Sequence, residues 1–185
     1  MSANPYVAEI LGELKQAAEQ LDDGQAELLA SRIGEARKLF VAGAGRSGLM
    51  AKAFAMRLAH LGLNAYVVGE SVTPPIGEGD LLILATGSGE TRSLVSMAEK
   101  AKSVQAAVAA VTIRPESTIG RLADLIVRLP GSPKEQAGSQ AATVQPMGSL
   151  FEQTLLLFFD GMILRLMKRC GHDSAAMFGR HANLE

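Results

Sequence analysis

Lys38-Leu39-Phe40-Val41-Ala42-Gly43-Ala44-Gly45-Arg46-Ser47-Gly48 is the stretch of sequence that decides the fold. Its apolar residues, within 38–42, suit a short strand that is buried on both faces, and a Gly-x-Gly-x-x-Gly run follows them directly. We expect a tight turn there and then a helix that continues to about Leu61. A strand, a glycine turn and a helix in this order are typical of one β-α unit of a parallel sheet.

The same pattern recurs farther along the chain. Residues 80–85 form an apolar run, which Thr86-Gly87-Ser88-Gly89-Glu90-Thr91 and a predicted helix to about Ser103 follow. Three further short apolar runs, at 65–68, 106–113 and 124–129, complete five strand candidates. Continuous apolar strands that alternate with helices indicate a parallel sheet with right-handed crossovers. The predicted fold class is therefore α/β, a three-layer, doubly wound, five-stranded parallel sheet with the flavodoxin-like order 2-1-3-4-5.

Helices are expected on either side of this sheet core, which spans 38–130. Helical spacing of apolar residues predicts helices within 4–36, and a long helix runs from about Gly148 to Cys170 within the C-terminal segment 148–185. The long helix is apolar nearly all round, so we expect coverage on both sides and a subunit interface on one. We see no linker, which predicts a single domain over 1–185.

The composition excludes several classes of protein. Lysine and arginine number 18 against 19 aspartates and glutamates, aromatic residues make up 4%, and Trp is absent. General electrostatic binding to nucleic acid or to acidic membranes is therefore not expected, nor is base stacking. One cysteine excludes an internal disulfide, and with three scattered histidines it offers no metal-ligand spacing. We expect a soluble, cytoplasmic protein with no metal and no cofactor.

The two Gly/Ser loops point to a phosphate site. In the order 2-1-3-4-5, strands 1 and 3 are neighbours, and ligands bind beyond their carboxyl ends. Each loop ends there and opens a helix, whose free N–H groups favour an anion, while hydroxyls add donors and glycines allow close approach. A small-molecule phosphate monoester suits this arrangement. The predicted substrate-binding residues are Gly45, Arg46, Ser47, Thr86, Gly87, Ser88, Gly89, Glu90 and Thr91.

Two other interpretations of these loops exist. A dinucleotide-binding fingerprint matches Gly43, Gly45 and Gly48 with the later acidic Glu70. However, Glu70 lies 27 residues after Gly43, farther than the usual ~20, and little chain remains for a separate catalytic half. Alternatively, Ser88 or Thr91 merely caps its helix. For either loop alone we favour capping, but two such loops on adjacent strands favour a binding site.

These motifs resemble those of the sugar isomerase (SIS) domain family, on the two loops and on Met147-Gly148-Ser149-Leu150-Phe151-Glu152. The tail Arg180-His181-Ala182-Asn183-Leu184-Glu185 resembles the 6-phospho-3-hexuloisomerase branch of that family. The resemblance implies interconversion of D-arabino-hex-3-ulose 6-phosphate and D-fructose 6-phosphate through an enediol, in the ribulose monophosphate pathway of formaldehyde fixation. It also implies a homotetramer and a possible functional pairing with hexulose-6-phosphate synthase.

Three alternative functions stay open beside this one. Arabinose 5-phosphate isomerases usually resemble an SIS domain followed by regulatory modules, for which the chain has no room. Heptose 7-phosphate isomerases tend to have metal-binding residues that we do not find. A non-catalytic regulator that binds a sugar phosphate normally adds a DNA-binding helix pair, and residues 1–37 contain no basic recognition helix.

Moving a carbonyl from C3 to C2 requires one group that takes a proton from C2 and returns it to C3. Glu152 shares a helical stripe with Leu155 and Phe159, so its carboxylate is expected to point inward. However, Ser149-x-x-Glu152 also matches a capping box, in which Glu152 is structural, and the residues alone do not decide.

The resemblance implies that Glu152 is the catalytic base and that His181 handles protons at the substrate oxygens. Sugar isomerases of this family often take such a histidine from a neighbouring subunit, and the sequence leaves open which subunit supplies His181. A tail that simply docks is the alternative for His181. Residues 131–146, including Gly138, Ser139 and Gln140, suit either a lid over the site or an ordinary surface loop.

Overall fold

The short apolar runs form one all-parallel sheet with the order β2-β1-β3-β4-β5. The computed structural model describes residues 4–131 and 143–183. Within those residues the strands are β1 (Leu39–Gly43), β2 (Ala65–Val67), β3 (Leu81–Ala85), β4 (Ala107–Thr112) and β5 (Leu125–Arg128). The predicted fold class and strand order are confirmed.

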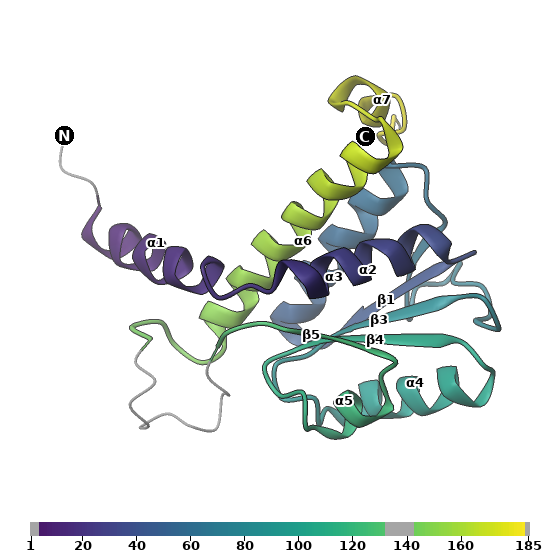
Figure 1. Cartoon of the computed structure of the whole chain (residues 1–185), viewed down its shortest axis with the longest axis horizontal. Helices are drawn as coiled ribbons and strands as arrows, with labels where there is room; N and C mark the ends of the chain where they lie inside the picture. The colour runs from purple at the N-terminus through teal and green to yellow at the C-terminus, as the bar shows by residue number, and fades with distance from the viewer. Residues whose placement is uncertain (1–3, 132–142, 184–185) are drawn as a thin grey trace.

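Helices cover both faces of the sheet, which makes three layers (Figure 1). In the described ranges they are α1 (Pro5–Ala18), α2 (Asp23–Glu35), α3 (Gly45–His60), α4 (Arg92–Ser103), α5 (Thr118–Leu122), α6 (Ser149–Cys170) and α7 (Ser174–Phe178). Helices α2, α3 and α6 lie on one face, and α4 and α5 lie on the other. Sequence periodicity missed α5 and α7 because each is too short to show a repeating apolar face.

Alternate residues of each strand pack against opposite layers of helices. In β1, Leu39 and Val41 belong to the core beneath α2, α3 and α6, whereas Phe40 and Ala42 belong to the core beneath α4 and α5. Because both faces are covered, the strands carry apolar residues at nearly every position instead of alternating with polar ones, and Thr112 and Arg128 stand only at strand ends.

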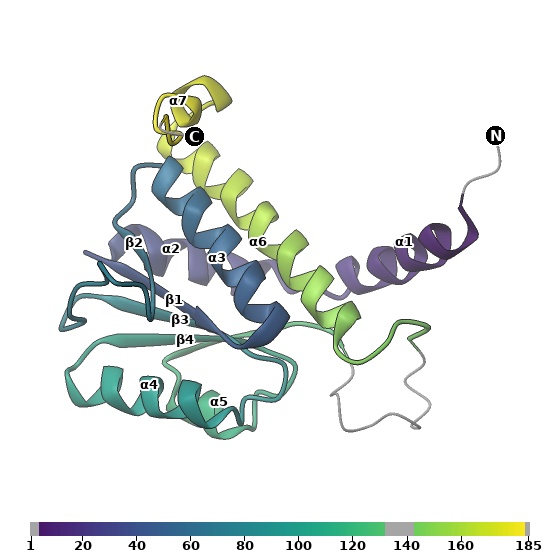
Figure 2. The ribbon, with the colours of Figure 1, turned by 180° about the vertical axis from the view of Figure 1, so that it is seen from behind.

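Helix α6 packs beside α3 across the sheet (Figure 2). The rings of Phe54 and Phe159 stack between the two helices, with 4.1 Å between their centroids. The other side of α6 stays uncovered within one chain, where Leu157 is 49% exposed and Leu164 is 68% exposed. A single subunit therefore covers only one of the two sides of α6 that we expected to be covered. The helix connects the carboxyl edge of the sheet to the C-terminal tail, about 33 Å away at 1.5 Å per residue.

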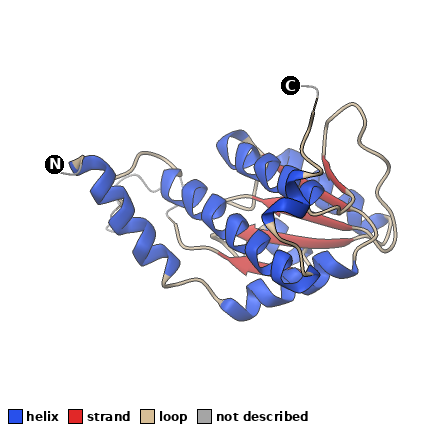
Figure 3. Ribbon diagram, turned by 90° about the horizontal axis from the view of Figure 1, so that it is seen from above, coloured by secondary structure: helices blue, strands red, loops and turns tan. Residues whose placement is uncertain are grey.

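Helix α1 projects away from the three layers, as Figure 3 shows from above. Its side chains Tyr6 and Leu11 are exposed, and among the described helices it packs mainly against α6. None of the described helices combines the length and the apolar character that crossing a lipid bilayer requires.

Candidate active site

The two Gly/Ser loops meet the start of α6 at the carboxyl edge of β1 and β3. They enclose a cavity of about 220 Å³, which lies between the layers at the point where the strand order reverses. The residues that line it are Ala44, Gly45, Ser47, Ala85, Thr86, Gly87, Ser88, Thr91, Leu94, Ile113, Gly148 and Phe151. This is the place where open α/β sheets bind their ligands.

The first loop turns directly from β1 into α3 because its glycines allow backbone to touch backbone. A Cβ atom on Gly48 would lie 2.6 Å from the carbonyl oxygen of Gly43, and Gly45 has a φ of 57°. Ala44 is the N-cap of α3, and no side chain in the described part of the chain caps that helix. The first turn therefore keeps backbone donors that suit an anion.

The second loop is similarly tight. Gly89 has a φ of 67°, and a Cβ atom there would lie 1.9 Å from Ser117 Oγ, so any other residue would be strained and would displace Ser117. Thr86 Oγ1 accepts a hydrogen bond from the Gly89 N–H at 3.1 Å, which holds the turn. Thr91 is the N-cap residue of α4, yet its side chain caps no N–H among the described residues. The capping interpretation therefore does not account for Thr91, whereas Ser88 accepts locally from the Glu90 N–H at 3.2 Å.

Glu90 is not among the residues that line the cavity. Its Oε1 accepts a hydrogen bond from the Thr118 N–H at 2.8 Å, and this bond, with the Thr118 side chain, holds the pKa of the carboxyl below its ordinary value. The carboxylate thus ties the second loop to the start of α5, and its predicted contact with substrate rests on sequence alone.

Glu152 is buried in the first turn of α6, with 5% of its surface exposed. Ser149 is not the N-cap residue that the capping-box alternative required: Gly148 is the N-cap, and the Ser149 hydroxyl accepts a hydrogen bond from Arg46 Nη1 at 3.0 Å. The same Nη1 atom lies 3.4 Å from Glu152 Oε2. Arg46 and Glu152 do not themselves line the cavity, but each is adjacent in sequence to described residues that do. The ion pair therefore joins the first loop to the first turn of α6 beside the residues that line the cavity.

His181 lies at the opposite end of α6. Its ring packs near that of His60, with 5.2 Å between the centroids. From Glu152 to Cys170 the helix rises about 27 Å, so the two predicted catalytic residues of one chain do not meet. Leu184 and Glu185 of the tail motif, and the proposed lid residues 138–140, lie outside the described residues.

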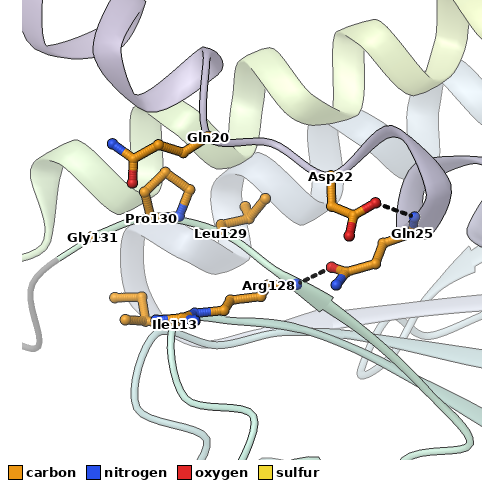
Figure 4. A pocket seen from close by; sticks show the side chains of 8 residues that line it. All are labelled: Gln20, Asp22, Gln25, Ile113, Arg128, Leu129, Pro130 and Gly131. Carbon is orange, nitrogen blue, oxygen red and sulfur yellow. Dashed lines mark hydrogen bonds between the residues drawn. The ribbon is translucent and has the colours of Figure 1, made fainter.

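A second cavity, of about 430 Å³, lies beside the first at the carboxyl end of β5 (Figure 4). Ile113 lines both cavities. Two of the polar groups of the second cavity serve the fold, because Asp22 caps α2 and Gln25 Oε1 accepts from the Arg128 N–H at 2.8 Å. The described residues that line it include no glycine loop that opens a helix, so the smaller cavity is the better candidate for a phosphate.

A doubly wound sheet with two Gly/Ser loops at its switch point defines the class of an α/β protein whose site suits a phosphate ester. Residues 32–157 match the SIS domain, and the chain belongs to the SIS domain family. Glu70 of the dinucleotide interpretation pairs instead with Lys52, with 3.7 Å between Glu70 Oε1 and Lys52 Nζ.

Similar chains include two curated relatives and one solved structure. The 3-hexulose-6-phosphate isomerase of Bacillus subtilis (strain 168) is 59% identical over 185 residues, which is the full length of both chains. The 3-hexulose-6-phosphate isomerase of Mycobacterium gastri is 42% identical over 173 residues, 94% of this chain and 86% of that one. A crystal structure of a hypothetical protein from Methanococcus jannaschii, with an inferred function of 3-hexulose-6-phosphate isomerase, has 37% identity and a TM-score of 0.81, covering 97% and 96% of the chains.

The cavity contains six of the predicted substrate-binding residues, namely Gly45, Ser47, Thr86, Gly87, Ser88 and Thr91. Sequence reasoning missed its apolar wall of Leu94, Ile113 and Phe151. Apolar side chains carry no chemical signature, and only the fold shows which of them face a cavity. The capping-box spacing around Phe151 indicated where α6 starts, but it did not indicate that Phe151 lines the cavity.

Proposed function

We propose that this chain is a sugar-phosphate isomerase that interconverts D-arabino-hex-3-ulose 6-phosphate and D-fructose 6-phosphate. The observation that carries the proposal is a buried carboxylate, Glu152, at the margin of a cavity lined by two loops that suit a phosphate. The full-length identity of 59% to a 3-hexulose-6-phosphate isomerase supports the same substrate.

The chemistry assigns one role to each part of the site. The loops hold the 6-phosphate through backbone N–H groups and the hydroxyls of Ser47, Ser88 and Thr91, with Gly89 and Glu90 shaping the second loop. Glu152 takes the proton from C2, and O3 gains a proton as the enediol forms. The O2 proton then leaves while Glu152 returns its proton to C3, which moves the carbonyl to C2.

Arg46 supplies the cation beside Glu152. Its guanidinium pairs with the Glu152 carboxylate, and its bond to Ser149 fixes the direction from which it approaches. Both contacts are with α6, so the first loop and the base are held as one unit.

Ring opening is not required in the forward direction. The hydroxyl that would close a five-membered ring on C3 is O6, and O6 carries the phosphate. The substrate is therefore open, and the enzyme depends less on a ring-opening acid than an isomerase of cyclic sugars does. His181, from a neighbouring subunit, is left to move protons between O2 and O3.

The assembly follows from the distance between the two predicted catalytic residues. Since His181 and Glu152 lie at opposite ends of α6, a complete site needs a second copy of the chain. The exposed side chains Leu157 and Leu164 supply apolar surface for such a contact. We infer a cytoplasmic homotetramer whose residues 1–185 act as one domain, supplied with substrate by a hexulose-6-phosphate synthase.

A coupled assay tests the substrate. The purified protein is offered D-arabino-hex-3-ulose 6-phosphate, arabinose 5-phosphate and heptose 7-phosphate separately, and we expect kcat/KM to favour the first. In D₂O, deuterium should enter C2 or C3 of the sugar. Preference for either of the other two substrates would contradict the proposal, and tight binding of all three without turnover would indicate a regulator.

A further inference from the structure

Glu13 of α1 binds three consecutive residues of the segment that precedes α6. Its Oε1 accepts a hydrogen bond from the Val144 N–H at 2.7 Å. Its Oε2 accepts from the Thr143 hydroxyl and from Gln145 Nε2, each at 2.8 Å. One carboxylate on the projecting helix therefore fixes both the backbone and two side chains of this segment, residues 143–148, which we call the strap.

The strap leads directly into the candidate active site. Gln145 is buried, with 7% of its surface exposed, and Met147 has a φ of 57°, a left-handed conformation that non-glycine residues rarely adopt. Gly148 then lines the cavity and caps α6, and Ser149 accepts the hydrogen bond from Arg46. A strained residue keeps its conformation only where its surroundings impose it, and the Glu13 contacts end two residues before it.

The charge of Glu13 suits an acceptor of three hydrogen bonds from the strap. Burial alone would raise its pKa, but the hydrogen bonds from Gln145, Val144 and Thr143 outweigh burial and lower the pKa below its ordinary value. The carboxylate is therefore ionised at neutral pH, and an ionised carboxylate accepts all three donors at once.

We propose that Glu13 is a positioning residue for the isomerase reaction, because its three hydrogen bonds hold the strap that sets the position of Gly148, Ser149 and Glu152. The inference rests on the proposed function, since it concerns the base of that reaction. It gives the projecting helix α1 a role in the site of its own chain. A base displaced by about 1 Å loses about a hundredfold in rate, whereas phosphate binding changes less, because the loop residues that line the cavity are not among the hydrogen-bond partners of Glu13.

The test compares kcat and KM of Glu13→Ala, Glu13→Gln and Glu13→Gln/Gln145→Glu with those of the wild type. Glu9→Ala is the matched control, because Glu9 is an exposed carboxylate on the same helix. We expect Glu13→Ala to lower kcat by about tenfold or more with KM within about threefold. The double variant exchanges the carboxylate and the amide, so it restores the pair between positions 13 and 145 and should recover most of kcat.

The outcomes separate this inference from the proposed function. A wild type that does not turn over D-arabino-hex-3-ulose 6-phosphate overturns the proposed function, and this inference falls with it. With an active wild type, a Glu13→Gln variant whose kcat equals that of Glu9→Ala overturns the positioning role alone. So does a double variant no better than Glu13→Gln, or a loss of activity that matches the loss of folded protein by circular dichroism. If Glu13→Ala fails to fold, the two isosteric variants decide.

Discussion

Arg46 Nη1 lies 3.0 Å from Ser149 Oγ and 3.4 Å from Glu152 Oε2, so one guanidinium of the first loop contacts two positions in the first turn of α6. The side chain of Glu152 is 6% exposed, whereas that of Arg46 is 46% exposed. The carboxylate is thus withdrawn from water and its cation is half accessible. This arrangement links the loop that suits the phosphate to the residue that would move the proton.

Glu152→Gln removes the base and changes little else. An amide of the same shape keeps a contact with Arg46 but accepts no proton, so kcat should fall by about 10²–10⁴-fold. Substrate affinity should stay within about tenfold, because a base acts in the transition state. Steady-state kinetics and calorimetric titration measure the two quantities. Glu99→Gln, the same change at an exposed glutamate on α4, is the control. Retained activity, or equal loss of rate and affinity, would reject Glu152 as the base.

Arg46→Ala should lower kcat/KM by about 10- to 100-fold, because Glu152 loses its cation and Ser149 loses its donor. Arg46→Lys should lose less, since it keeps the charge but lacks the planar fork that reaches both partners. Lys52→Ala, an exposed cation on the same helix, should have wild-type kinetics. Equal kcat/KM for the alanine and lysine variants would show that the charge of Arg46 plays no part.

Thr91→Val separates substrate binding from helix capping. The Thr91 side chain caps no described N–H, so we expect almost no change in the free energy of unfolding. KM should rise by about tenfold or more if the hydroxyl donates to the phosphate. Asp22→Ala is the contrasting variant, because Asp22 accepts from the Gly24 and Gln25 N–H groups and should lose about 1 kcal/mol of stability. Urea unfolding and KM measured together decide, and a Thr91 variant that loses stability with an unchanged KM would favour capping.

The sheet could be predicted from sequence because its strands are buried on both faces. A continuous apolar run such as 81–85 has few other places in a soluble fold, and glycine turns mark where each strand ends. The two loops could be placed together because strands 1 and 3 are neighbours in the flavodoxin-like order that we expected and the structure has.

The side-chain directions at the site could not be predicted in the same way. Ser149 and Glu152 have capping-box spacing, yet Arg46, more than a hundred residues earlier, takes the serine hydroxyl. Glu90 sits in a binding-loop motif, but a partner on α5, a helix too short for periodicity to reveal, takes its carboxylate. Contacts between residues distant in sequence decide these directions, and such contacts cannot be identified from a single sequence.

Gly48→Ala should destabilise the protein by about 1–3 kcal/mol, because the new Cβ would lie 2.6 Å from the Gly43 carbonyl oxygen and backbone atoms must shift. Gly34→Ala is the matched control: it is also helical, a Cβ atom there would meet nothing within 4 Å, and it should gain about 0.5–1 kcal/mol. Thermal or urea unfolding compares them. Similar stabilities for the two variants would show that the close approach of β1 and α3 is not required.

His60 should make stability fall in mildly acidic solution. The pKa of this buried histidine is lowered, first by burial and then by the charges of Arg57 and His181. Arg57 Nη1 lies 3.3 Å from His60 Nδ1, and a guanidinium only donates, so Nδ1 accepts and the neutral ring carries its proton on Nε2. The tail adds a further cation, since Arg180 Nη1 lies 3.5 Å from the His60 carbonyl oxygen. Protonation of His60 therefore meets positive charge from both α3 and the tail.

Because the pKa of His60 is lower in the folded state, the unfolded chain binds more protons below its ordinary value of about 6.5. The contribution of His60 to stability is thus complete above that pH and declines as the pH falls through the window below it. His60→Gln, which keeps an acceptor for Arg57, should lose less stability than the wild type between about pH 7.5 and about pH 5.5. Urea midpoints at the two pH values measure this difference, with His172→Gln as the control. If the wild type and His60→Gln lose equal stability over this window, protonation of His60 does not destabilise the folded protein.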